Sequence, residues 1–196
     1  HYEGIDDADI IFICVGTPPQ DDGSADLTYI TSASESIGSA LKGSEKYHVI
    51  TVKSTVPPGT TESVVIPAVM KSLGDTPDLV GFCMNPEFLR EGRAIDDFLH
   101  PDRIVIGGSS EKAISVVQKA YEKLDALVIT TSLKAAEMIK YTSNAFLATK
   151  ISFSNEIGNI CKRIGIDVYE VMKGVGYDHR INPYFLNAGL GFGGSC

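Results

Sequence analysis

An amine and an amide stand four residues apart in this sequence, at Lys140 and Asn144. Residues at that spacing on an α-helix are neighbours on one face. Two such groups can donate hydrogen bonds to a single developing oxyanion. They belong to a polar stripe that a solvated helix face explains equally well: Glu137, Lys140, Asn144, Asn155 and Asn159. The stripe alone leaves both interpretations open.

A thiol follows a glycine-rich run, in Gly193-Gly194-Ser195-Cys196. Glycines let a backbone pass close to a ligand. A cation such as Lys140 favours the thiolate, which is the nucleophilic form of a cysteine. The sequence therefore suggests Cys196 as a nucleophile, and a terminal cysteine without a role is the alternative.

Charged side chains elsewhere offer acid, base and phosphate-binding groups. Glu87 and Glu91 flank Phe-Leu-Arg, and both carboxylates share a face if that segment is helical. One of them can then act as a general base or hold a water. The alternative is an exposed first helical turn that carries acids. Arg180 is a candidate for bidentate phosphate binding, and the four histidines have no metal-site spacing, so no metal is predicted.

Short apolar runs alternate with amphipathic segments in the first two thirds of the chain. Strands are expected over residues 8–15, 48–53, 80–83, 103–106 and 127–130. Helices are expected over 27–41, from 60 to about 73, and over 110–124. This alternation predicts a parallel, right-handed α/β sheet of the Rossmann-like kind.

The strands end in polar motifs, and ligands bind at the carboxyl ends of strands in open α/β sheets. We therefore expect one sheet edge to gather Thr17, Ser54, Thr55, Glu87 and Glu91.

A long helix is expected over residues 132–164, which contain no proline. Ser132 can cap its start, and Gly165 suits a left-handed stop. At ~1.5 Å per residue the helix is about 50 Å long, so it spans two structural units or forms an interface. Its apolar face consists of Ala135, Ile139, Thr142, Phe146, Phe153, Ile157, Ile160 and Ile164. The expected domains are a partial cofactor-binding α/β domain over 1–131 and an all-helical central domain over 132–196.

The bulk composition narrows the class of protein. The net charge of -8 argues against binding to nucleic acids or anionic membranes. No apolar run is long enough for a membrane span. The four cysteines fit neither a zinc site nor a disulfide framework, which favours a reduced, cytoplasmic setting.

The sheet also looks incomplete. A nucleotide-binding domain normally opens with a strand, a Gly-x-Gly-x-x-Gly turn and a helix, and this motif does not occur here. We therefore expect the chain to be part of a longer polypeptide.

Five segments spread in order over the chain resemble the UDP-glucose/GDP-mannose dehydrogenase family. They are Cys14-Val15-Gly16-Thr17-Pro18, Ser54-Thr55-Val56-Pro57-Pro58-Gly59-Thr60, Asn85-Pro86-Glu87-Phe88-Leu89-Arg90-Glu91-Gly92, Ala136-Glu137-Met138-Ile139-Lys140-Tyr141 with Asn144, and Phe185-Leu186-Asn187-Ala188-Gly189 running into Gly191-Phe192-Gly193-Gly194-Ser195-Cys196. The combination is specific, although no single segment is.

The resemblance implies an enzyme that uses NAD to oxidise the C6 alcohol of a nucleotide sugar to a carboxylate, in two successive hydride transfers. By this match Cys196 is the nucleophile that forms a thiohemiacetal and then a thioester. Lys140 and Asn144 would steady the C6 oxygen. Glu87, helped by Thr17, would handle the hydrolytic water.

The same resemblance implies binding residues and a homodimer through the long helix, in which Arg180 reaches the phosphates across the interface. Cofactor contacts are implied at Thr17, Ser54, Thr55 and Glu91. Substrate contacts are implied at Glu87, Phe88, Leu89, Arg90, Glu91, Lys140, Asn144, Arg180, Phe185, Leu186, Asn187, Ala188, Gly189 and Gly193.

The 185–189 segment favours UDP-glucose, with GDP-mannose and UDP-N-acetylmannosamine as alternatives. Because the family's first βα unit and the residues after the cysteine are missing, we expect this chain alone to be inactive. A β-hydroxyacid dehydrogenase also pairs a lysine with an asparagine on a long helix, but needs no cysteine. A dimerisation or regulatory module without catalysis needs neither Lys140 nor Cys196.

Overall fold

The computed structural model describes residues 4–74 and 77–193. The chain divides into two compact units, His1–Tyr141 (unit 1) and Thr142–Cys196 (unit 2). Unit 1 contains the β-sheet, and unit 2 contains helices and loops only among its described residues. Helix α5 (Leu133–Ile164) contributes residues to both, as its length suggested.

Five strands form one sheet in the order β1 to β5: β1 (Ile10–Ile13), β2 (His48–Val52), β3 (Val80–Met84), β4 (Arg103–Gly108) and β5 (Leu127–Thr131). Strands β1, β2 and β3 are parallel, and Ile50 lies between Ile11 and Phe82. Every residue of β2 and β3 is buried, because these strands are covered on both faces. The α/β class is confirmed.

The expected all-parallel sheet is wrong at one pairing, because β4 runs antiparallel to β3, with Met84 opposite Gly107. A parallel pairing needs a crossover connection, usually a full helix. The segment between β3 and β4 contains only the short helix α3 (Ala94–Leu99), which turns the chain back. Strand β5 is parallel to β4, so both end at the opposite edge of the sheet from β3. Helix α5 therefore starts at that opposite edge. The rise along the helix from Leu133 to Lys140 is about 10 Å, and it places Lys140 towards the carboxyl end of β3.

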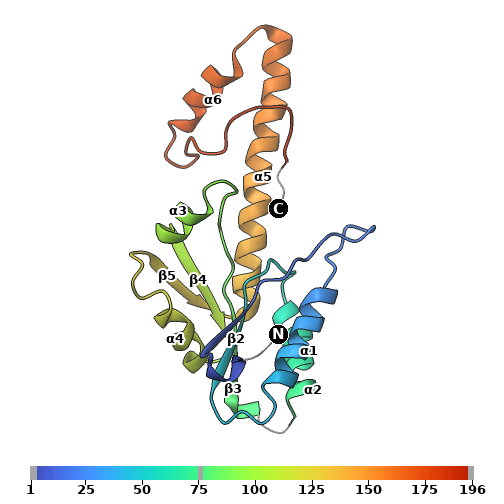
Figure 1. Ribbon diagram of the computed structural model, residues 1–196. Helices are drawn as coiled ribbons and strands as arrows, with labels where there is room; N and C mark the ends of the chain where they lie inside the picture. Colours follow the sequence, from blue (N-terminus) through green and yellow to red (C-terminus); the bar gives the residue numbers. More distant parts are fainter. Residues whose placement is uncertain (1–3, 75–76, 194–196) are drawn as a thin grey trace. The chain divides into compact units, whose positions relative to one another are not determined.

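Helices cover both faces of the sheet (Figure 1). On one face, α1 (Thr28–Ala40), α2 (Ile66–Leu73) and the first turns of α5 pack over Ile50, Val52 and Met84. On the other face, α4 (Glu111–Lys119) packs over alternate residues of the same strands, such as Val49 and Cys83. A π-helical turn, η2 (Thr61–Val65), leads into α2. Short 3-10 turns, η1 (Ile5–Asp7) and η3 (Pro77–Leu79), precede β1 and β3.

The ends of the helices follow their capping residues. The Asp26 carboxylate accepts the N–H of Thr28 at 2.8 Å, and the Ser110 hydroxyl oxygen accepts the N–H of Ala113 at 3.2 Å. Gly165, with φ of +72°, ends α5, and the N–H of Ile166 donates to the Cys161 carbonyl oxygen. The expected start and end of the long helix are therefore confirmed to within one residue.

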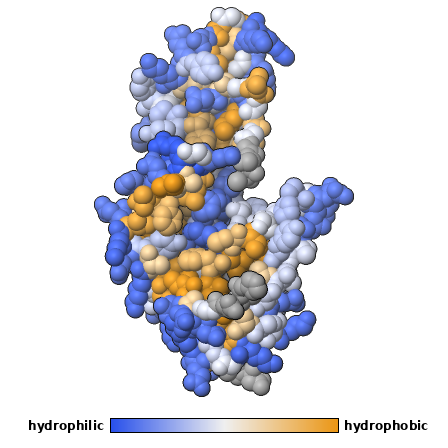
Figure 2. All heavy atoms as spheres, viewed as in Figure 1, coloured by the Kyte–Doolittle hydropathy of each residue, from blue (hydrophilic) through white to orange (hydrophobic). Residues whose placement is uncertain are grey.

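Exposed apolar side chains mark two parts of the chain. In unit 1 they gather on α3, where Ile95 and Leu99 are exposed, and over the sheet (Figure 2). In unit 2, Phe146, Phe153 and Ile160 of α5 are exposed although they belong to the predicted apolar face. The helical periodicity thus identified an apolar face, but among the described residues that face is only partly covered after Tyr141, where Ile157 is half-buried.

Unit 2 continues through α6 (Val168–Gly176), whose first turn is capped by Asp167. The loop after α6 is fastened to the two helices. Asn155 of α5 accepts the N–H of Gly189 at 2.7 Å, and the Tyr169 hydroxyl donates to the Ala188 carbonyl oxygen at 2.9 Å. Lys150 donates to the Ile181 carbonyl oxygen at 3.1 Å.

Candidate functional site

Glu87 and Lys140 form an ion pair at the carboxyl end of β3. The Lys140 ammonium donates to the Glu87 carboxylate, with 3.0 Å between Nζ and Oε1. Only 7% of the Lys140 side chain and 30% of the Glu87 side chain are exposed. Low exposure weakens solvent screening, so the attraction between the two charges is stronger than at the surface. The structure thus joins two residues that are 53 positions apart and that the sequence analysis had selected independently.

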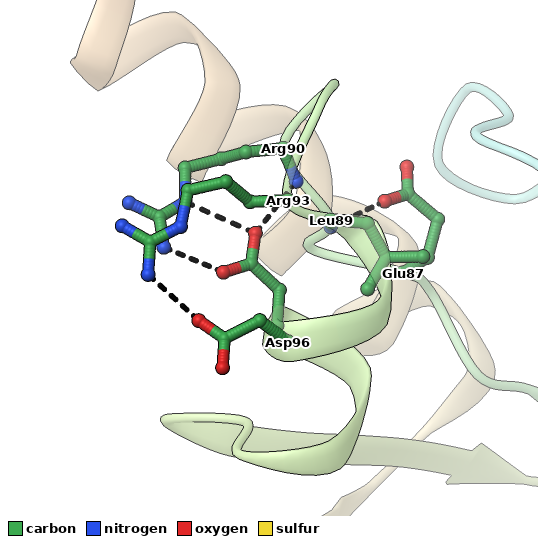
Figure 3. A network of polar contacts seen from close by, with 6 residues as sticks. Glu87, Leu89, Arg90, Arg93 and Asp96 are labelled. Atoms are coloured by element: carbon green, nitrogen blue, oxygen red, sulfur yellow. Dashed lines mark hydrogen bonds and ion pairs between the residues drawn. The ribbon is translucent and has the colours of Figure 1, made fainter.

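The segment after Glu87 is a turn and not the helix that would place Glu87 and Glu91 on one face. The second Glu87 oxygen accepts the backbone N–H of Leu89 at 2.6 Å. Figure 3 shows that the Glu87 carboxylate points away from the guanidinium groups of Arg90 and Arg93. The turn itself therefore orients Glu87.

Arg90, a predicted substrate contact, is held by an acid of the same segment. Its Nε and Nη2 donate to Asp97 at 3.0 and 2.5 Å, and its backbone N–H donates to the same carboxylate. These hydrogen bonds lower the pKa of Asp97 to about 2. Arg93 pairs with Asp96 beside it (Figure 3). In this structure the Arg90 guanidinium stabilises the turn.

Phe88 lies between two cations. The Arg103 guanidinium lies 4.0 Å from the centre of its ring, and the Lys140 ammonium lies 5.3 Å from it. The face of an aromatic ring attracts a cation. Phe88 therefore helps to hold Lys140 in place.

Glu137 is a buried acceptor, so the interpretation of the stripe as a solvated helix face is wrong at this position. One oxygen accepts the N–H of Gly59, and the other accepts the N–H and the hydroxyl of Thr61 at 2.8 and 2.6 Å. These bonds fasten α5 to the loop that leads into η2. The periodicity had grouped Glu137 with Lys140 correctly, because both face the sheet domain and not the solvent.

The loops after β1 and β2 carry the predicted cofactor contacts. The Thr17 hydroxyl donates to the Thr55 carbonyl oxygen at 2.8 Å, and the Ser54 hydroxyl donates to the Val15 carbonyl oxygen at 2.6 Å. A Cβ added at Gly16 would meet no described atom within 4 Å. The hydroxyl oxygens keep lone pairs that can accept from a ribose. This edge therefore fits the approach of a dinucleotide, and the structure gathers Thr17, Ser54 and Thr55 as expected.

The polar network of Lys53, Asn85 and Tyr121 was not predicted by the sequence analysis. The Asn85 side-chain oxygen accepts from the Lys53 ammonium at 2.9 Å and from the Tyr121 hydroxyl at 2.5 Å. Burial lowers the pKa of Lys53 to about 8 and raises that of Tyr121 to about 12. Two sequence features could have identified members of this network: Lys53 lies at a strand end, and Asn85 belongs to the Asn-Pro-Glu motif. Nothing local in the sequence identified Tyr121.

The remaining predicted residues belong to unit 2. Asn144 is exposed on α5, so the oxyanion contact shared with Lys140 stays a prediction. The Arg180 guanidinium pairs with Asp178, with Nη2–Oδ2 at 2.5 Å, and 77% of its side chain is exposed. This pairing lowers the pKa of Asp178.

The 185–189 segment is a loop in which Phe185 has φ of +62° and Leu186 is buried. Positive φ is uncommon for a bulky residue, and it is often found where a loop serves a ligand. Asn187, Gly189 and Gly193 are exposed, and Ala188 is half-buried. Cys196, the predicted nucleophile, lies outside the described residues.

The described residues contain no metal-binding cluster and no membrane-spanning helix. No three His, Cys, Asp or Glu side chains in residues 4–74 and 77–193 come close enough to hold a metal ion. None of the helices described is at once long enough and apolar enough to cross a membrane.

Comparison with known proteins gives a consistent result. Residues 1–125 match the NAD binding domain of the UDP-glucose/GDP-mannose dehydrogenase family, and residues 134–196 match its central domain. UDP-glucose 6-dehydrogenase TuaD of Bacillus subtilis is 50% identical over 189 residues, covering 96% of this chain and 40% of TuaD.

Two solved structures are similar to this chain. One is a UDP-glucose dehydrogenase from Pyrobaculum islandicum, with a TM-score of 0.95 and 48% identity over 99% of this chain and 44% of that chain. The other is a GDP-mannose dehydrogenase from Pseudomonas aeruginosa, with a TM-score of 0.88 and 42% identity over 98% of this chain and 45% of that chain. The chain thus spans less than half the length of these relatives.

Proposed function

This chain belongs to the UDP-glucose/GDP-mannose dehydrogenase family, and from that premise we propose that the whole protein oxidises UDP-glucose to UDP-glucuronate with NAD. The Glu87–Lys140 pair, in which the lysine is buried and the glutamate half-buried, carries the proposal. Formation of a carboxylate at C6 needs a cation that stabilises the developing oxyanion and a base that takes a proton from the hydrolytic water. The pair supplies a carboxylate and an ammonium at one point, at the sheet edge where α/β proteins bind ligands.

Lys140 has the role of holding the C6 oxygen, because its ammonium is nearly excluded from solvent and therefore acts strongly. Glu87 accepts the proton of the hydrolytic water. Its second oxygen is fixed by the Leu89 N–H, which keeps the first oxygen directed at Lys140. Asn144 and Thr17 assist at the same carbon, and Cys196 is the nucleophile, as the family motifs imply.

The cofactor is held by the loops after β1 and β2, through Thr17, Ser54 and Thr55, and Glu91 is the further cofactor contact that the family motifs imply. When bound, NAD accepts a hydride in each of two oxidations, so one alcohol, one water and two NAD⁺ give one carboxylate, two NADH and three protons. The hydrogen bonds between the two loops keep their hydroxyls in fixed positions before the cofactor arrives.

The substrate assignment to UDP-glucose is supported by the 185–189 segment and by the names of similar relatives. TuaD, at 50% identity, is named a UDP-glucose 6-dehydrogenase, and the GDP-mannose dehydrogenase of known structure is 42% identical. The 185–189 loop is fixed by Asn155 and Tyr169, which supports a role as a preformed binding surface. The remaining substrate contacts are those implied by the family motifs.

A homodimer through α5 is also proposed. The exposed phenylalanines of unit 2, Phe146 and Phe153, are 61% and 53% exposed, and a second copy of the helix would remove them from water. A cytoplasmic location is supported by the use of NAD and by the free thiols of Cys14, Cys83 and Cys161.

The test is to follow NADH absorbance in the whole protein with UDP-glucose, GDP-mannose and UDP-N-acetylmannosamine. We expect turnover with UDP-glucose and formation of two NADH per sugar. Turnover with another of the three would correct the substrate, and silence with all three would favour a non-catalytic dimerisation module.

The Cys196→Ser variant separates this proposal from a β-hydroxyacid dehydrogenase. Loss of acid formation supports the thioester route, and unchanged turnover would reject it.

A further inference from the structure

A third charged group lies next to the Glu87–Lys140 pair and has no role in the function proposed above. Lys53 follows the last residue of β2, and its partly buried ammonium donates to Asn85 at 2.9 Å and to the Tyr121 hydroxyl oxygen at 3.3 Å. The same ammonium lies 5.7 Å from the centre of the Tyr121 ring. A lysine turned inwards in this way is rare unless it is paired or used.

Asn85 connects this lysine to the site. Its backbone N–H donates to the Val52 carbonyl oxygen at 2.9 Å, and its side-chain amide donates to the Val105 carbonyl oxygen at 2.7 Å. Its side-chain oxygen accepts from both Lys53 and Tyr121. The Asn85 side chain therefore has two donors to its oxygen and an acceptor for its nitrogen, and Glu87 follows it by only two residues. A buried polar network whose members are hydrogen-bonded to one another holds them in one geometry.

We propose that Lys53 is a positioning residue for the Glu87–Lys140 pair: with Tyr121 it fixes the Asn85 amide, and it places a second positive charge beside the pair. This inference rests on the proposed function only for its catalytic consequence. The network itself consists of residues of unit 1 that the structure describes.

Charge supports this geometry. Four titratable groups face the Lys53 ammonium: Cys14 after β1, Glu87 in the turn, Lys140 on α5, and Tyr121 after α4. Desolvation is the largest cause of the lowered pKa of Lys53. The anionic forms of Cys14 and Glu87 raise this pKa, and the charge of Lys140 lowers it further. The Tyr121 pKa of about 12 keeps its hydroxyl a donor throughout the working range.

The first experiment needs no turnover. Lysine side chains of this chain are labelled with ¹³C and titrated by NMR, and the Lys53 signal is assigned by its loss in Lys53→Arg. We expect a midpoint near 8, because the pKa of Lys53 is about 8. The midpoint should fall in Glu87→Gln, which removes an attracting charge, and rise in Lys140→Met, which removes a repelling one.

The control is Lys119→Met, because Lys119 is an exposed lysine at the end of α4. It should leave the Lys53 midpoint unchanged. The proposal is overturned unless both shifts appear with these signs. If Lys140→Met does not fold, the result for Glu87→Gln alone decides.

The second experiment measures the whole protein. Tyr121→Phe removes only a hydroxyl and Lys53→Met removes the charge, and each should lower kcat about tenfold while KM for the nucleotide sugar changes less than about threefold. If either variant keeps kcat within about twofold of Lys119→Met, the positioning role is wrong. If the wild-type protein oxidises no nucleotide sugar, the proposed function fails, and the NMR titration still decides the role of Lys53.

Discussion

The Glu87–Lys140 pair of unit 1 and the Arg180 loop of unit 2 are both expected to meet a nucleotide sugar, yet they are built differently. Lys140 is nearly buried and is held by Glu87 and by the ring of Phe88. Arg180 is 77% exposed and pairs with Asp178 of the same loop.

This difference in exposure matches a difference in expected role, because Lys140 is expected to act on the reacting atoms and Arg180 to recognise the substrate. A reacting charge needs a fixed position and little solvent, and unit 1 supplies both through long-range contacts. A recognition loop needs a fixed backbone and accessible side chains. Unit 2 supplies the fixed backbone through Asn155 and Tyr169 and leaves Arg180 in solvent.

The largest effect is expected at the pair. Lys140→Met should lower kcat of the whole protein by about 10² to 10³, because it removes the donor to the developing oxyanion. The matched control is Lys134→Met, an exposed lysine of the same helix that pairs with Glu62. If Lys140→Met loses no more activity than this control, unit 1 is not the chemical centre and the contrast between the units fails.

A stability effect of intermediate size is expected at Glu137. Glu137→Gln should lower the free energy of unfolding by about 2–3 kcal/mol, because an amide donor would face the N–H groups that the carboxylate now accepts. Urea denaturation of this chain measures the loss. Glu156→Gln, at an exposed position of α5, should change little. An equal change in both variants would show that Glu137 does not fasten α5 to the loop before η2.

The smallest effect is expected in the loop. Arg180→Ala should raise KM for UDP-glucose about tenfold and leave kcat and the urea midpoint unchanged, because an exposed guanidinium contributes to binding phosphate and little to the fold. Arg163→Ala, at the exposed end of α5, is the control. A drop in kcat at constant KM would instead give the loop a chemical role. The division into a reacting unit 1 and a substrate-recognising loop of unit 2 would then be wrong.

Local signals in the sequence predicted the five strands and the longer helices, although the helix expected over 110–124 ends at Lys119 and α3 was not expected. The bounds of α5 follow from the absence of proline and from Gly165, and the strands follow from short apolar runs. The reversal between β3 and β4 was missed, because strand direction depends on how the short segment with α3 turns in space. That reversal is what brings α5 back to the carboxyl end of β3.

Sequence reasoning selected the two residues of the ion pair but did not predict all of their contacts. Glu87 and Lys140 were named, but periodicity shows only which residues share a face, so Glu137 was placed in the wrong environment. The hydrogen bonds among Lys53, Asn85 and Tyr121 join residues that lie 32 to 68 positions apart in the sequence. No spacing rule predicts such contacts. The Arg180–Asp178 pair is two residues apart and was open to prediction.

The central claim is that Glu87 and Lys140 act on one carbon of a nucleotide sugar. Its most direct test is a rapid-mixing measurement on Glu87→Gln in the whole protein, with UDP-glucose and NAD. If Glu87 serves hydrolysis, two NADH per site should form quickly, after which turnover should slow at least about a hundredfold while the sugar stays bound to Cys196. Steady turnover at the wild-type rate, or the absence of any rapid NADH formation, would contradict the account.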